Sequence, residues 1–220
     1  MGTSITTKTI VQDEGTTILA GDVIDFTGTG VNVSSVGGKA TVAIPGNIPS
    51  TSYGIFAQTS SSTPATGIAK NSIVGTGAGT LTVPANSFQI GDSFTCALDG
   101  LLSCLGSATL HIYVETLAGV VLADTGIIAM ETTTSKAWLL TLYFTIRTVG
   151  GVGVASISSG GLFSYIKNAG TNFEGFVLSN INTTTFNTTV DNTLVITAQW
   201  NTGSASNKIQ SYNFILQKVY

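Results

Sequence analysis

The sequence predicts an all-β protein whose main part is an antiparallel β-sandwich of the jelly-roll type. Apolar and polar residues alternate in many short segments, and no stretch longer than about ten residues follows a helical period. Strand signals recur about every 8 to 12 residues after residue 50, which gives about eight to ten strands, enough for a jelly roll. Only 8 Lys and Arg and 11 Asp and Glu occur among 220 residues, so we expect polar but largely uncharged outer faces.

Composition also limits the class of partner. A hydrophobic content of 43% and a mean hydropathy of +0.40 exclude a disordered chain. No apolar stretch approaches the roughly 18 to 20 residues that cross a bilayer, so we expect no membrane insertion. A net charge of −3 and the lack of a Lys or Arg cluster argue against a nucleic-acid partner. Weak surface charge favours assembly, because it does little to oppose contact between subunits.

The strongest domain boundary is the segment Ile44–Pro49, where two prolines surround Gly46 and Asn47. We therefore divide the chain into a small β module, residues 1–49, and a larger domain, residues 50–220. The first segment has only short apolar bursts and lacks cysteine, so it is too small for a stable core of its own. We expect other copies of itself, or a larger assembly, to stabilise it.

Period-two alternation places the main strands of the second domain. We expect a short strand over residues 79–84, ended by a proline, and longer strands over residues 107–115, 137–148 and 194–200, with another near the C-terminus. The residues expected to share apolar faces are Leu110, Ile112 and Val114; Trp138, Leu140, Leu142, Phe144 and Ile146; Leu194, Ile196, Ala198 and Trp200; and Tyr212, Phe214 and Leu216.

Turns and loops are predicted from Gly, Ser, Thr, Asn and Pro. Gly150 and Gly151 turn the chain, after which residues 152–158 begin a return strand. Residues 59–66 are rich in Ser, Thr and Pro and are expected to form a loop. Residues 180–192 are rich in Asn and Thr, which predicts a long loop or an irregular edge strand.

The two cysteines, Cys96 and Cys104, are too few for a disulfide scaffold. Asp99 and Gly100 between them could form a hairpin turn. A three-residue loop would set the cysteines opposite each other, whereas a two-residue loop would pair Cys96 with Ser103. The alternative is that both cysteines are simply small buried residues.

No catalytic, cofactor or metal site is expected, and we expect that the chain is not an enzyme. His111 is the only histidine, and Glu115, on the same predicted strand, would be about 13 Å away. A triad or a zinc site needs more ligands than this histidine and two cysteines provide. The acidic residues are scattered, without a calcium-loop pattern or the paired carboxylates of a glycosidase.

Exposed aromatic rings are the best sequence candidates for a binding surface, because carbohydrate rings can stack on them. Phe173, Phe176 and Phe186 are the binding candidates, and residues 59–66 and 173–192 are the loops expected to contact a receptor. Trp138 and Trp200 fall on apolar faces, which indicates core positions.

Two groups of motifs resemble virion structural proteins. The first comprises Val11-Gln12-Asp13-Glu14-Gly15, Ile24-Asp25-Phe26-Thr27-Gly28-Thr29-Gly30-Val31 and Lys39-Ala40-Thr41-Val42-Ala43-Ile44-Pro45-Gly46. It is similar to a short module of bacteriophage tail fibres. The second comprises Leu81-Thr82-Val83-Pro84-Ala85-Asn86, Gly91-Asp92-Ser93-Phe94, Trp138-Leu139-Leu140, Thr197-Ala198-Gln199-Trp200 and Ser204-Ala205-Ser206-Asn207-Lys208-Ile209. It resembles a jelly-roll domain of phage and other virus structural proteins.

The resemblance implies a homotrimeric fibre or spike on the surface of a virion. The N-terminal module would join other virion proteins, and the head, similar to tumour-necrosis-factor-like trimers, would help attachment to a host receptor or glycan. No matched position is a catalytic residue of such proteins. One alternative is a capsid decoration or minor capsid protein that stabilises the shell. Another is a free lectin-like or cytokine-like trimeric binding protein, which has little need of an anchor module.

Overall fold

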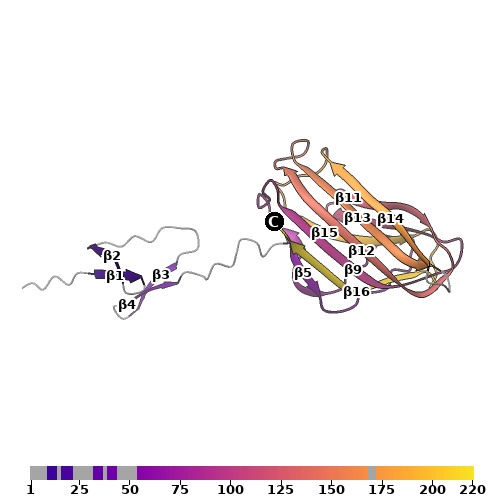
Figure 1. The fold of residues 1–220 in the computed structure, drawn as a ribbon, viewed down its shortest axis with the longest axis horizontal. Coiled ribbons are helices and arrows are strands. Elements are labelled where there is room, and N and C mark those ends of the chain that lie inside the picture. The colour runs from indigo at the N-terminus through magenta and orange to yellow at the C-terminus, as the bar shows by residue number, and fades with distance from the viewer. Residues whose placement is uncertain (1–8, 14–15, 22–31, 37–38, 44–53, 168–171) are drawn as a thin grey trace, which may run out of the picture. The chain divides into compact units, whose positions relative to one another are not determined.

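The structure is a computed structural model that describes residues 9–13, 16–21, 32–36, 39–43, 54–167 and 172–220 (Figure 1). The chain falls into two compact units, Met1–Ile48 and Pro49–Tyr220. Among the described residues there are strands and turns but no helix, so the all-β prediction is confirmed.

Unit 1, Met1–Ile48, holds two separate antiparallel strand pairs. Strand β1 (Thr9–Asp13) pairs with β2 (Thr16–Gly21), and β3 (Asn32–Val36) pairs with β4 (Lys39–Ala43). A single two-stranded sheet is marginally stable in water, because it buries little apolar surface on either face. The described part of unit 1 therefore contains only elements that gain stability by adding further strands.

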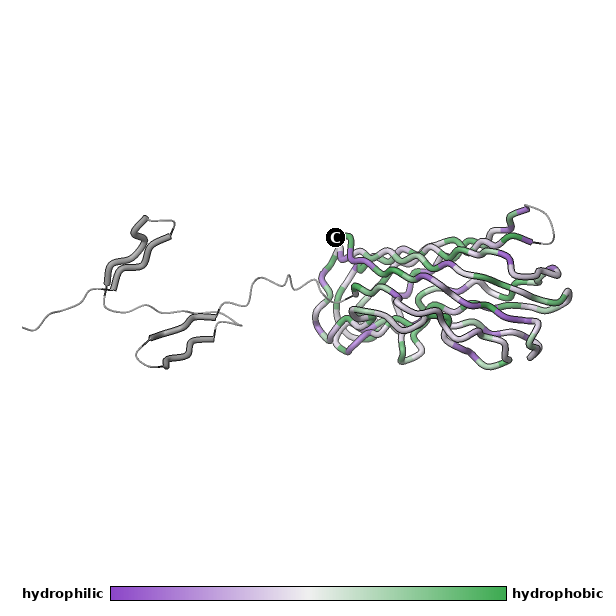
Figure 2. Tube along the Cα trace, turned by 90° about the horizontal axis from the view of Figure 1, so that it is seen from below, coloured by the Kyte–Doolittle hydropathy of each residue, from purple (hydrophilic) through white to green (hydrophobic). Residues whose placement is uncertain are grey.

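Unit 2, Pro49–Tyr220, is an antiparallel sandwich of two sheets. Its strands are β5 (Ile55–Gln58), β6 (Asn71–Ser72), β7 (Gly77–Thr80), β8 (Thr82–Val83), β9 (Ser93–Cys104), β10 (Thr109–Thr116), β11 (Val121–Ala129), β12 (Thr133–Thr148), β13 (Ser156–Lys167), β14 (Asn172–Asn182), β15 (Asn192–Trp200) and β16 (Lys208–Lys218). The large sheet has the order β14-β13-β12-β9-β16-β5-β7 and the small sheet β11-β10-β15-β6, with β8 also on β15. Figure 2 shows the two layers.

The strand connections confirm the jelly-roll type. Strands β9 and β16 pair in the large sheet, and their chain neighbours β10 and β15 pair in the small sheet. Two paired runs of chain therefore cross together from one sheet to the other, which is the wrapping that defines a jelly roll. The Asn201 and Asn207 side chains join the crossings, since their Oδ1 atoms accept the N–H groups of Thr109 at 2.8 Å and Leu105 at 2.9 Å.

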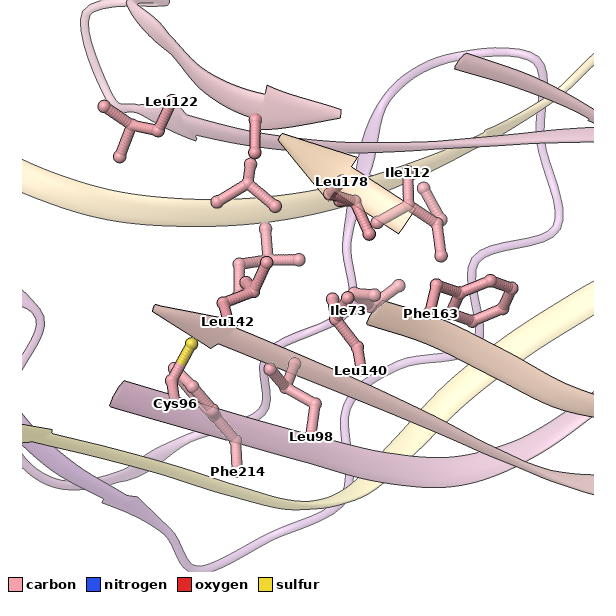
Figure 3. Close-up of a cluster of buried hydrophobic side chains, with 14 of the residues drawn as sticks. Ile73, Cys96, Leu98, Ile112, Leu122, Leu140, Leu142, Phe163, Leu178 and Phe214 are labelled. Carbon is pink, nitrogen blue, oxygen red and sulfur yellow. The ribbon is translucent and has the colours of Figure 1, made fainter. Parts of the chain in front are cut away.

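The core lies between the sheets and matches the predicted alternation in most strands (Figure 3). Strand β10 buries Leu110, Ile112 and Val114, and β12 buries every second residue from Trp138 to Ile146. Each inward residue leaves its neighbour on the outer face, because side chains alternate across a strand. The predicted core positions of both tryptophans are likewise confirmed, and their indole N–H groups donate to backbone carbonyls.

The hairpin predicted at Asp99 and Gly100 is wrong, because both residues lie inside the continuous strand β9. Gly100 serves close packing instead: a Cβ there would lie 1.9 Å from the Gln210 carbonyl oxygen of β16. Cys96 and Cys104 are free and buried near opposite ends of this strand. Eight residues of strand separate them by about 26 Å, which rules out a bond between them.

Tyr212 was predicted to share an apolar face with Phe214 and Leu216, and this is wrong. The register of β16 against β9 shifts between Ser211 and Asn213, so one extra residue lies on β16. The bulge reverses the alternation, which buries Ser211 and leaves Tyr212 largely exposed. Phe214 and Leu216 are buried, as predicted.

Three boundaries also differ from the prediction. Residues 79–84 contain the end of β7 and all of β8, and these two strands lie in different sheets. Residues 152–155 still belong to the turn, and the return strand β13 begins at Ser156. Strand β14 extends to Asn182 as a regular edge strand, and only residues 183–191 form the loop that follows it.

The register of the large sheet gives unit 2 two distinct ends. At the near end, the N–H of Ser93 donates to the carbonyl of the C-terminal Tyr220 at 3.0 Å. A Cβ on Gly54 would meet the Phe94 ring, so the chain also enters the unit at the near end. At the far end, Lys208 at the start of β16 pairs with Ser103 near the end of β9.

Candidate functional site

The outer face of the large sheet is the broadest candidate surface of unit 2. Direct cross-strand partners form one row that runs through all seven strands: Val177, Leu162, Thr141, Ala97, Ile215, Ala57 and Ala78. The next row toward the near end is Ser179, Gly160, Tyr143, Thr95 and Gln217. These two rows contain no charged residue, and we call them the uncharged face.

Several large apolar side chains on the uncharged face are open to solvent. Val177 is 79% exposed and Tyr143 is 58% exposed, and Leu162 and Ile215 are also exposed. A hollow of about 310 Å³ lies between Thr141, Tyr143 and Ile215. Contiguous apolar surface with a hollow at its centre is typical of protein–protein interfaces rather than of a free monomer surface.

The uncharged face reaches the edge of the large sheet at β14, where Asn180 and Asn182 donate to backbone carbonyls of β11. Edge strands of soluble proteins usually carry Lys or Pro, or are broken by bulges. Strand β14 has none of these: its sequence holds one charged residue, Glu174, and its pairing with β13 is regular along its whole length. Strand β11, the edge of the small sheet beside it, is irregular, with two register shifts against β10.

The outer face of the small sheet carries charge instead. The Lys70 ammonium pairs with both carboxylate oxygens of Glu115, at 2.8 and 3.0 Å, and lies 3.8 Å from the centre of the Tyr113 ring. The Tyr113 hydroxyl donates to Gln199 Oε1 at 2.9 Å. These contacts pair the charged groups of Lys70 and Glu115 and the Tyr113 hydroxyl within the chain.

His111 belongs to the same face and stacks on Tyr113 with ring centres 3.8 Å apart. Its Nε2 atom lies 3.4 Å from Asp124 Oδ1 of β11, without hydrogen-bond geometry. The carboxylate nearest to His111 is therefore Asp124, which the sequence did not indicate because the pairing of β10 with β11 was not predicted. The His111 ring thus lies between the Tyr113 ring and the Asp124 carboxylate.

The three aromatic binding candidates do not gather on one surface. Phe173 and Phe176 lie on β14, so their placement in a loop was wrong, and only Phe173 is well exposed, at 72%. Phe176 stacks on Tyr165 at 6.4 Å. Phe186 lies in the predicted loop but is buried, with its ring 5.8 Å from Phe88. Ring stacking on a carbohydrate thus stays a prediction for Phe173 alone.

The two predicted receptor loops lie in different places. Residues 59–66 run along β16 toward the far end, where Ala65 bridges to Ile209. Residues 183–191 follow β14 at the near end, and Asn182 organises their start. Its Oδ1 accepts the N–H groups of Thr184, Thr185 and Phe186 at 3.0 to 3.2 Å. One bound receptor surface could not readily cover both loops.

The structure brings together one carboxylate pair that the sequence did not reveal. Lys167 Nζ lies 3.2 Å from Glu131 and 3.9 Å from Glu174, and the Tyr165 hydroxyl donates to Glu174 at 2.7 Å. Burial, and then the hydrogen bond to Glu174, raises the pKa of Tyr165. A lysine that contacts two carboxylates is typical of a stabilising ion-pair network.

No group of three or more His, Cys, Asp or Glu side chains in the described part of the chain could hold a metal ion. The same residues include no helix long and apolar enough to cross a membrane. No protein-family model matches the chain. No curated protein matches it either.

Proposed function

We propose that this chain is a virion structural protein: a homotrimeric fibre or spike whose jelly-roll head helps attachment to a host. The single observation that carries the proposal is the uncharged face, one row of which crosses all seven strands of the large sheet, with its exposed apolar side chains. Copies of the head bury this face against one another. The threefold order rests on the resemblance to trimeric viral heads, not on the face itself.

Unit 1 supports an anchoring role. Its described strands form two isolated pairs, which gain stability when strands from other copies or from other virion proteins join them. A protein that works free in solution has little use for such a segment. The proposed location is therefore the surface of the particle, with unit 1 as the contact to other virion proteins.

The mass of the protein in solution tests this proposal. At micromolar concentration, light scattering on the full chain should give about three times the 22.5 kDa chain mass. The same measurement on residues 49–220 should give about three times the mass of that fragment. A trimer that persists without unit 1 supports a self-assembling head. A monomer at all concentrations contradicts it, and favours a decoration or minor capsid protein completed by its neighbours in the shell.

A further inference from the structure

A groove of about 310 Å³ opens at the far end of unit 2, opposite the end where the chain enters. It lies where β9 ends and where β12 and β16 begin. Its lining residues include Ser103, Thr132, Thr134, Ser135 and Ser206, whose side chains carry hydroxyls, and Lys208, whose side chain carries an ammonium. A volume near the lower limit for small-molecule sites, about 300 Å³, suits one terminal residue of a larger ligand.

A bulge at the start of β12 shapes this groove. The register against β9 moves from Thr133 opposite Cys104 to Lys136 opposite Leu102, which places one extra residue on β12. Ser135 has a positive φ of 48°, and its N–H donates to Ser103 Oγ at 2.9 Å. As a result, the consecutive residues Thr134 and Ser135 are both exposed, whereas a regular strand would turn one of them inward.

Four hydroxyl groups and one ammonium group of the groove are available to a ligand. Among the described residues, the hydroxyls of Thr132, Thr134, Ser135 and Ser206 make no hydrogen bond with another residue, and Lys208 makes no ion pair. No carboxylate lines the groove. Glu131, next to Thr132 in the chain, is paired with Lys167 at 3.2 Å.

We infer that this groove binds the acidic terminal residue of a host glycan, with the sugar carboxylate at Lys208 and the ring hydroxyls at the Ser and Thr side chains. Hydroxyls can both donate to and accept from sugar hydroxyls, and an ammonium without a protein partner selects for an anion. The inference rests on the proposed attachment function.

A second polar groove, between β11 and β14, fits this role less well. It is about 320 Å³ in volume and is lined by Asp124, Asn180 and Asn182. The amide Nδ2 atoms of both asparagines already donate to backbone carbonyls of β11, at 3.0 Å to Leu122 and 3.0 Å to Val121. Asp124 would repel an acidic ligand. The hydrogen bonds of Asn180 and Asn182 to β11 instead hold the two sheets together at this side of the sandwich.

Binding of the full chain to an array of immobilised glycans tests the inference. The array holds matched pairs that differ only in a terminal sialic or uronic acid. We expect retention of acidic members and not of their neutral partners, with at least a tenfold loss for Lys208→Gln and a smaller loss for Thr134→Val. Arg147→Gln is the matched control, because Arg147 is exposed at the near end and has no ion pair among the described residues.

The glycan array and light scattering distinguish a failure of the groove inference from a failure of the proposed trimeric spike. If no acidic glycan is retained, or if Lys208→Gln binds as well as the original protein, the groove inference is overturned. A trimer in light scattering then leaves the assembly proposal standing. If the protein is monomeric yet binds acidic glycans through Lys208, the groove stands and the trimeric spike falls, because one chain supplies every lining residue.

Discussion

The uncharged face of the large sheet and the outer face of the small sheet differ in charge, although the same chain builds both. On the small sheet, Lys70, Glu115, His111 and Asp124 contact one another or Tyr113. On the large sheet, the two rows of the uncharged face hold no charged residue, and Val177 and Tyr143 are exposed. Charged groups resist removal from water, whereas exposed apolar groups favour it. The comparison indicates that the outer face of the small sheet stays exposed to solvent, whereas another subunit covers the uncharged face of the large sheet in the assembled protein.

A charge placed on each face should give the largest effect. Val177→Lys buries an ammonium in the proposed contact, so we expect association to weaken at least about 100-fold, equivalent to about 2.7 kcal/mol. Ile127→Lys is the matched control, since Ile127 is 74% exposed on the small sheet. Analytical ultracentrifugation measures the association constants of both variants. Equal constants would contradict the assignment of the subunit contact to the uncharged face.

The thiol of Cys96 tests the packing directly behind the large-sheet face. Burial raises the pKa of Cys96, so the folded thiol stays protonated while the unfolded one ionises above about pH 8.5. Stability from this site is full below that pH and is lost as the pH rises. At pH 10 we expect a loss of about 2 kcal/mol relative to pH 8 that Cys96→Val removes. Urea unfolding in reductant at both pH values measures it, and an identical pH dependence in the variant would refute it.

Two tyrosines should separate assembly from stability. Tyr143→Ala on the uncharged face should weaken association about tenfold, equivalent to about 1.4 kcal/mol, with little change in unfolding free energy. Tyr113→Ala should instead lower the free energy of unfolding by about 1 to 2 kcal/mol, because Tyr113 contacts Lys70, His111 and Gln199. Association and urea unfolding are measured for both, and the reverse pattern would contradict the assignment of the two faces.

The ion pair of the small sheet should give the smallest effect. A double-mutant cycle with Lys70→Met and Glu115→Gln should yield a coupling of about 0.5 to 1 kcal/mol, because the Lys70 side chain is 40% exposed and water screens the charge. The oligomeric mass should not change in any of these variants. A change of mass would place this pair in the interface.

Much of the fold could be predicted from the sequence, because side-chain alternation is a local signal. Strands β10 and β12 show it clearly, and their inward residues were identified. The failures occur where a distant strand decides the outcome. Gly100 looks like a turn residue but serves the close approach of β16, and Tyr212 is displaced by a bulge that only pairing with β9 reveals.

The candidate sites were harder to predict for the same reason. Phe173, Phe176 and Phe186 were grouped by type and by nearness in the chain, but a strand and a buried loop separate them. The uncharged face joins side chains from seven strands, and the far-end groove joins β9, β12 and β16. The low charge of the sequence did predict assembly, but it did not show which sheet forms the contact between subunits.

Hydroxyl-radical footprinting across protein concentration tests the central claim most directly, since it reports which side chains lose contact with water on assembly. The account predicts that Tyr143 and Leu162 become severalfold less reactive as the mass rises, while Ile127 and Tyr113 keep their reactivity. If the mass rises while Tyr143 and Leu162 stay reactive, the copies meet through another surface and the uncharged face is not the interface.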